Sequence, residues 1–232
     1  MLKTFNIDFL NIFKQKNINF RLTQKLSLLF SYILLSLMFT SCINLREDYP
    51  EINYYGIKTD NIKAAKFKAE GLLQVRPFGG ANLLSERRFM VETSEGKTDK
   101  YYYHRWSDDF QELFTWEVIS QLSKGKYFTD GIVNQGTALI PDYILEGDIL
   151  SLRIYNDEDN RVDSSFVELQ VKINLISRKP SKSSINSLYT NDYTQRITRK
   201  SNKALTISAA VSKAAEMIIT QIGDDIVKQI NQ

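Results

Sequence analysis

Cys42 combines reactive chemistry with an informative position. It is the only cysteine in the chain, and it follows an uncharged apolar run at residues 26–39 and the small polar residues Thr40 and Ser41. A basic start, an apolar core and small residues before a cut site are the layout of a secretory signal peptide. The apolar run is shorter than the roughly 18 residues that a permanent membrane span needs. Residues 1–41 are therefore predicted to be a signal peptide that is removed.

The four residues Phe39-Thr40-Ser41-Cys42 resemble the lipobox of bacterial lipoproteins. The resemblance implies that the Cys42 thiol receives a diacylglycerol, that the chain is cut before Cys42, and that the new amino group is acylated. Each buried methylene contributes about 0.8 kcal/mol, so two or three acyl chains would hold the protein on a membrane. Ile43 stands where an aspartate would favour the inner membrane, which implies the outer membrane, facing the periplasm. The alternative is a buried free cysteine behind a core helix.

Charge balance argues against a nucleic-acid partner. The whole chain has 30 basic and 27 acidic residues, but residues 1–41 hold five of the basic ones and one acidic one. The remaining 191 residues therefore carry 25 basic and 26 acidic residues, a net charge of −1. Binding to phosphate backbones needs a basic surface, which this balance does not indicate.

Other residues with catalytic or metal-binding chemistry form no convincing site. His104 is the only histidine, and without a cysteine partner it does not predict a zinc centre. Gly96-Lys97-Thr98 imitates the end of a phosphate-binding loop, but the first glycine of that motif would fall at Val91. Asp157, Asp159 and Glu168 lack the glycine of a calcium loop. We therefore expect a protein that is not an enzyme and that holds no cofactor and no metal.

The apolar pattern predicts runs of strands. A first main strand is expected at residues 72–75, ended by Pro77 and a Gly79-Gly80 turn, after a short edge strand at 53–57. Residues 88–93 and 98–105 form a predicted hairpin around the turn at 94–97. A longer hairpin is expected from 142–155 and 162–177, since Val167, Leu169 and Val171 alternate with polar residues. A weaker strand is expected at 188–197, after a loop at 179–187.

Two helices complete the pattern. The first is predicted from Ser107 as N-cap to Gly125 as stop, with Phe110, Phe114 and Val118 at helical spacing. The second covers residues 208–230. Its apolar stripe consists of Val211, Ala214, Ala215, Ile218, Ile222, Ile226 and Ile230. These elements predict an α+β fold, with a mixed or antiparallel sheet and two helices packed on one face. The predicted domains are the signal peptide at 1–41, a lipidated tether at 42–68 and one α+β domain at 69–232.

The order of motifs after the tether is similar to that of the ABC-type transport auxiliary lipoproteins. These accompany mammalian-cell-entry (MCE) systems that carry lipids between bacterial membranes. The matching features are Tyr54-Tyr55-x-Ile57, Leu73-x-Val75-x-Pro77-Phe78, the strand at 88–91, Tyr103-x-Arg105-Trp106 before a helix, and the Ala-rich last helix. The resemblance implies a non-enzymatic component of a lipid-transport complex with an MCE-domain protein as partner, docked through an exposed sheet edge or the tyrosine-rich strand.

Two other classes of function stay open. The first is a structural or assembly lipoprotein that supports an outer-membrane protein complex, and the second is a periplasmic hydrolase. Self-association into a homo-oligomer is compatible with each of them. Trp106 lies between a strand and a helix cap, so we expect it to pack in the core rather than contact a partner.

Overall fold

The computed structural model describes residues 28–33, 50–59, 64–80, 84, 86–157, 159, 164–178 and 186–232. The chain divides into two units, Met1–Tyr49 and Pro50–Gln232. In the first unit, residues 28–33 are helical. Cys42, the predicted lipid-attachment residue, lies outside the described residues. None of the described helices is both long and apolar enough to span a membrane.

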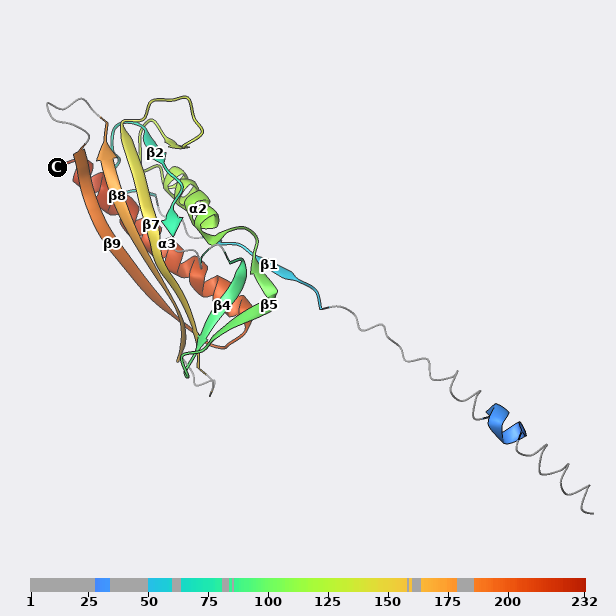
Figure 1. The fold of residues 1–232 in the computed structure, drawn as a ribbon. Helices are drawn as coiled ribbons and strands as arrows, with labels where there is room; N and C mark the ends of the chain where they lie inside the picture. Colours follow the sequence, from blue (N-terminus) through green and yellow to red (C-terminus); the bar gives the residue numbers. More distant parts are fainter. Residues whose placement is uncertain are drawn as a thin grey trace, which may run out of the picture. The chain divides into compact units, whose positions relative to one another are not determined.

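The second unit is an α+β fold built on one open, mixed sheet of nine described strands (Figure 1). The strands are β1 (Asn53–Tyr55), β2 (Leu73–Val75), β3 (Gly79–Gly80), β4 (Arg88–Thr93), β5 (Thr98–Trp106), β6 (Ile132–Asn134), β7 (Tyr143–Asn156), β8 (Ser165–Ser177) and β9 (Asn186–Arg199). The two helices of this unit are α2 (Phe110–Lys124) and α3 (Ala204–Ile230). This architecture confirms the predicted fold class.

β7 is the strand that organises the sheet. On one side it pairs antiparallel with β8, which pairs antiparallel with β9. On its other side it pairs in parallel with β2, β3 and β4 at successive positions along its length. β4 leads through β5 to the edge strand β1, and β2 leads to β6. β9 and β1 therefore lie at different edges of the sheet.

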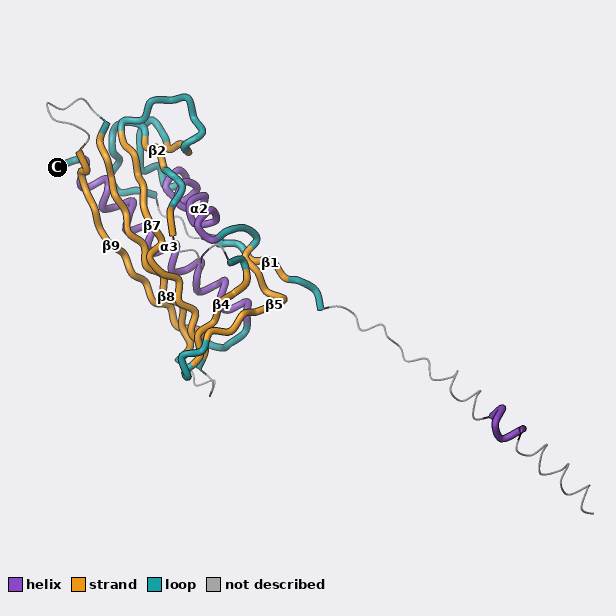
Figure 2. Tube along the Cα trace, viewed as in Figure 1, coloured by secondary structure: helices purple, strands orange, loops and turns teal. Residues whose placement is uncertain are grey.

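Both helices cover the same face of the sheet, as Figure 2 shows. Along β8 the residues that point to this face are fully buried, and those between them are partly exposed, which is the expected pattern of a sheet with one wet face. α3 lies along β8 and β9 and also packs against α2. A β-carbon on Gly223 of α3 would lie 2.5 Å from Tyr127 Cε1, so the glycine permits the close approach of α3 to the segment after α2.

Polar groups also join β9 to α3. The Tyr193 hydroxyl donates a hydrogen bond to Asp225 of α3 at 2.9 Å, and Tyr189 reaches the same carboxylate at 3.3 Å. Burial, reinforced by these neighbours, raises the pKa of Tyr193 above its ordinary value. Tyr193 therefore stays protonated and remains a hydrogen-bond donor.

Two local expectations need correction. Gly79-Gly80 is strand β3 rather than a turn, because its backbone pairs with Asp148 and Ile149 of β7. The N-cap of α2 is Asp109 rather than Ser107, and it caps through its backbone carbonyl without a side-chain hydrogen bond. The amide of Ser107 instead donates to the carbonyl of Tyr55 in β1.

Part of the expected tether is built into the fold. β1 pairs with β5, and Ile57 and Thr59 are buried. Ala69 forms a bridge with Phe128, and the amide of Ala65 donates to Gly125. The polar composition of residues 42–68 predicts a tether, but backbone pairing needs no apolar pattern. The compact unit therefore begins near Pro50.

Candidate docking surface

A bulge in β5 exposes the tyrosine-rich segment of the chain. Arg88 of β4 pairs with Arg105, whereas its neighbour Phe89 pairs with Tyr101. Tyr102, Tyr103 and His104 therefore have no partner residue in β4. Bulges redirect side chains and are frequent beside functional sites. The side chain of Tyr102 is 65% exposed and that of Tyr103 is 47% exposed.

The bulge lies against the edge strand β1. Asn53 pairs with His104, and Tyr54 pairs with Arg105. Tyr54 is 57% exposed, so a third tyrosine lies beside the bulge. We call the exposed side chains of Tyr54, Tyr102 and Tyr103 the tyrosine surface.

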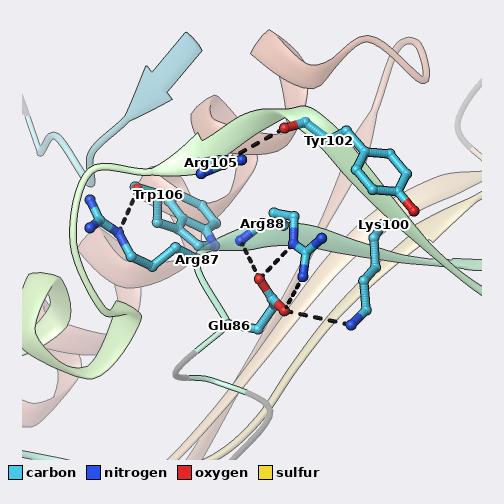
Figure 3. A network of polar contacts seen from close by, with 7 residues as sticks. All are labelled: Glu86, Arg87, Arg88, Lys100, Tyr102, Arg105 and Trp106. Atoms are coloured by element: carbon cyan, nitrogen blue, oxygen red, sulfur yellow. Dashed lines mark hydrogen bonds and ion pairs between the residues drawn. The ribbon is translucent and has the colours of Figure 1, made fainter. Parts of the chain in front are cut away.

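Basic side chains surround one carboxylate beside this surface (Figure 3). Glu86 accepts hydrogen bonds from Arg88 Nε and Nη2, both at 2.8 Å, and Lys100 Nζ lies 3.5 Å from the same carboxylate. These hydrogen bonds from Arg88 lower the pKa of Glu86 to about 2. Glu86 is thus ionised at neutral pH and holds the Arg88 guanidinium 5.7 Å from the centre of the Tyr102 ring.

Two further arginines donate hydrogen bonds to backbone carbonyls in the same region. Arg87 Nε donates to the carbonyl of Trp106 at 3.3 Å, and its Nη2 donates to the carbonyl of Ser107. Arg105 Nε lies 3.5 Å from the carbonyl of Tyr102, across the bulge. The network in Figure 3 therefore contains four basic side chains and one carboxylate.

A groove continues the tyrosine surface toward α3. It has a volume of about 410 Å³ and lies between the end of β1 and the first half of α3. Tyr54 and Leu205 contribute apolar area, and Leu205 is 71% exposed. Lys58, Lys213 and Glu216 also line the groove, and Lys213 Nζ lies 2.9 Å from the Glu216 carboxylate. Exposed aromatic side chains are enriched at protein-binding surfaces.

His104 has a structural partner in this region. Its Nδ1 lies 2.9 Å from the Tyr55 hydroxyl, and its ring lies 5.9 Å from the Tyr101 ring, centre to centre. Among the described residues, no group of three histidine, cysteine, aspartate or glutamate side chains could hold a metal ion. His104 therefore orients Tyr55 within the β1–β5 ribbon.

Trp106 lies in the core, as predicted. It is 2% exposed, and its ring packs against Phe89 at 4.5 Å and Phe110 at 5.3 Å between centres. A side chain this deeply buried cannot contact a partner directly. Trp106 instead fixes the corner between β5 and α2, beside the tyrosine surface.

Gly96 of the phosphate-loop-like residues and Glu168 of the calcium-loop-like residues have structural roles. Gly96 has a φ of 74°, and it lies in the turn between β4 and β5, where that left-handed conformation favours glycine. Glu168 lies on β8, where its carboxylate pairs with Arg196 at 3.3 Å and with Arg153 at 3.8 Å.

A second cavity, of about 450 Å³, lies between α2 and the chain around β3. Its walls include the half-exposed Trp116, the carboxylates of Asp109 and Glu112, and the apolar Phe78. No histidine, cysteine, lysine or arginine is among its described lining residues.

Sequence reasoning pointed to the tyrosine-rich strand and to a sheet edge as separate docking options. The structure brings them together, because β1 is the edge strand beside β5. The sequence alone did not predict the roles of Glu86, Arg88 and Leu205. Three consecutive tyrosines interrupt strand alternation and could have signalled the bulge, whereas no local pattern shows that Leu205 faces β1.

Comparisons with known proteins support the fold. No family model and no curated protein matches the chain. The protein XCC0632 from Xanthomonas campestris, described as DUF330, has a similar structure with a TM-score of 0.64 and 13% identity, over 76% of this chain and 96% of that one. An uncharacterized protein is similar with a TM-score of 0.56 and 12% identity, over 76% and 99% of the two chains. At these identities the likeness shows a shared fold.

Proposed function

We propose that this chain is a lipid-anchored periplasmic protein, held at the outer membrane by Cys42, and that it is a non-enzymatic component of an ABC/MCE-type transport system that moves lipids between membranes. The observation that carries the proposal is the tyrosine surface, which a bulge and an arginine–glutamate network hold outward. The signal peptide and lipobox-like residues support the anchor, and the motif order supports the family.

The surface is built for docking rather than for chemistry. Tyrosine and arginine are enriched among the residues that dominate binding energy at protein interfaces. The ionised Glu86 restrains Arg88, so less side-chain freedom is lost when a partner binds. The basic side chains favour a partner surface with exposed carboxylates. We assign this role to the MCE-domain protein.

The length of the free tether limits where the domain can work. Asn53, the first residue of β1, is eleven residues after Cys42. A fully extended chain spans about 3.3–3.6 Å per residue, so the tether reaches roughly 40 Å at most. The tyrosine surface begins at β1 and therefore stays near the membrane that holds Cys42. A partner has to extend toward it across the remaining distance.

Affinity purification of the full chain from cells tests the proposal. The wild type is expected to recover an MCE-domain protein and its ATPase. Replacing Tyr54 and Tyr102 by alanine should reduce that recovery at least tenfold. Trp116→Ala is the matched control, because Trp116 is an equally exposed aromatic on α2 and lies outside the tyrosine surface.

The same experiment separates the competing function. Recovery of an outer-membrane barrel alone, together with unchanged membrane lipids after gene deletion, would favour an assembly lipoprotein. Equal recovery of the MCE-domain protein by the double variant would refute the role of the tyrosine surface.

A further inference from the structure

β9 is an unusually long open edge. It has 14 residues and pairs only with β8 among the described strands. Its pairing with β8 runs without a register shift from Tyr189 to Arg199. Edge strands are normally blunted by proline, lysine, bulges or short length. β9 contains no proline and no lysine, so its free backbone groups form a template for another strand.

The exposed side chains of β9 form a self-complementary row. The residues on the wet face are Leu188, Thr190, Asp192, Thr194, Arg196 and Thr198. The single acid and the single base of this row lie symmetrically about Thr194. Asp192 makes no ion pair with any residue that the structure describes.

We infer that β9 pairs antiparallel with β9 of a second copy of this chain, with the two-fold axis between the two Thr194 residues. In this register Asp192 of each copy lies opposite Arg196 of the other, and Thr190 lies opposite Thr198. Opposite charges and threonine pairs are favourable across antiparallel strands. The backbone hydrogen bonds supply affinity, and the two ion pairs select the register.

Nearby registers lack this match. A shift of two residues toward either end of β9 moves the two-fold axis by one residue and places Asp192 and Arg196 opposite threonine residues. A shift of four residues makes either the two Asp192 or the two Arg196 residues face each other, which is destabilising. Charge complementarity therefore favours one register over its neighbours.

The existing contacts of Arg196 are compatible with the pairing. Its guanidinium lies 3.6 Å from the centre of the Phe166 ring, and Nε lies 3.3 Å from Glu168. Both contacts are with residues of β8, so the pairing requires the guanidinium to turn toward the free edge of β9 or to bridge Glu168 and the second Asp192. On the helix-covered face, Gln195 hydrogen-bonds Gln221 of α3 at 3.3 Å, so uncharged groups lie beside the two-fold axis.

Cysteine cross-linking of the full chain in its membrane tests the geometry. In this register the two Thr194 Cα atoms lie about 4.5–5.5 Å apart, within the range of a disulfide. Thr194→Cys should therefore give a covalent dimer under mild oxidation. Thr190→Cys and Thr198→Cys should each give none alone, since like positions lie about 27 Å apart at 3.4 Å per residue. Co-expressed, these two variants should cross-link to each other.

Charge reversal tests the recognition. Asp192→Arg and Arg196→Asp should each weaken self-association about tenfold, measured by ultracentrifugation of the detergent-purified chain. A mixture of the two variants restores both attractive pairs and should form a heterodimer with nearly the original affinity. Asp192→Arg breaks no ion pair within its own chain but places the new cation opposite Lys172 of β8, so the stability of each variant is measured alongside.

A monomeric wild-type chain, or a Thr194→Cys variant that cross-links no more than the unchanged chain with Cys42, would overturn the inference. The β9 edge is distinct from the tyrosine surface, so either proposal can fail without the other.

Discussion

Trp106 carries a large share of the packing at the corner between β5 and α2. Its ring contacts Phe89 and Phe110, and it is almost fully buried. Trp106→Ala is expected to lower the free energy of unfolding by roughly 3–5 kcal/mol, because it removes apolar contacts and leaves a cavity. Denaturant titration measures this loss. Trp116→Ala, at a 53% exposed position, should change stability by only about 0.5 kcal/mol. Similar values for both variants would contradict this account of Trp106.

Glu86 should make stability depend on pH in the acid range. Hydrogen bonds from Arg88 lower its pKa in the folded chain from the ordinary 4.5 to about 2. A carboxylate with a lowered folded pKa stabilises the fold above its unfolded pKa, and this contribution is lost as pH falls from about 4.5 to about 2. Glu86→Gln should flatten the stability profile in that window and leave the slope near pH 7 unchanged. Chemical unfolding at a series of pH values measures it, and an unaltered acid slope would refute the assignment.

At the scale of elements, α3 supplies one wall of the core. Ile218 is fully buried at the middle of the helix, against the sheet. Ile218→Asp would bury a charge without a partner and should cost several kcal/mol, or leave the carboxyl protonated. Thermal unfolding should show a much lower Tm for this variant than for Ala209→Asp, which introduces the same charge at an exposed position of α3. Equal Tm values would exclude α3 from the core.

Elements with a strong local pattern were predictable from the sequence. The β4–β5 hairpin, β7, β8 and α2 lie within a few residues of their expected positions because alternation or helical spacing marks them. The C-terminal end of α3 at Ile230 was also correct, whereas the helix begins four residues before Ser208. Helix starts are poorly marked here, since the N-cap Lys203 makes no side-chain cap.

Elements defined by distant partners were not predictable. β3 has two glycines, and β6 has three residues, so neither segment has room for a periodic pattern. Both are strands because β7 and β2 lie beside them. The candidate docking surface also depends on partners that are distant in the sequence. The tyrosines are visible in the sequence, but their outward placement depends on the bulge opposite β4 and on the pairing of β1 with β5.

At the scale of the whole molecule, the proposals place two association surfaces on one anchored domain. The tyrosine surface includes the first strand after the proposed tether, and the β9 edge belongs to the last strand. A tether attached at β1 limits the distance between the membrane and the tyrosine surface more than the distance between the membrane and the β9 edge. Pairing through β9 would also put two lipidated cysteines on one dimer, so each domain would be held by twice as many acyl chains. The time that the dimer stays on the membrane would then depend on the lipids attached to Cys42 of both copies.

The proposed anchor rests on the chemistry of Cys42, and Cys42→Ser tests it directly. Serine keeps the size and polarity of the side chain but lacks the thiol to which the diacylglycerol would be attached. The variant is expected to take up no labelled palmitate and to keep residues 1–41, or to leave the membrane fraction once they are removed. Ser41→Ala is the matched control, because alanine is also small and leaves the thiol in place. Metabolic labelling followed by fractionation measures both outcomes. Equal labelling of the wild type and Cys42→Ser would remove the anchor and, with it, the limit of roughly 40 Å on the reach of the tyrosine surface.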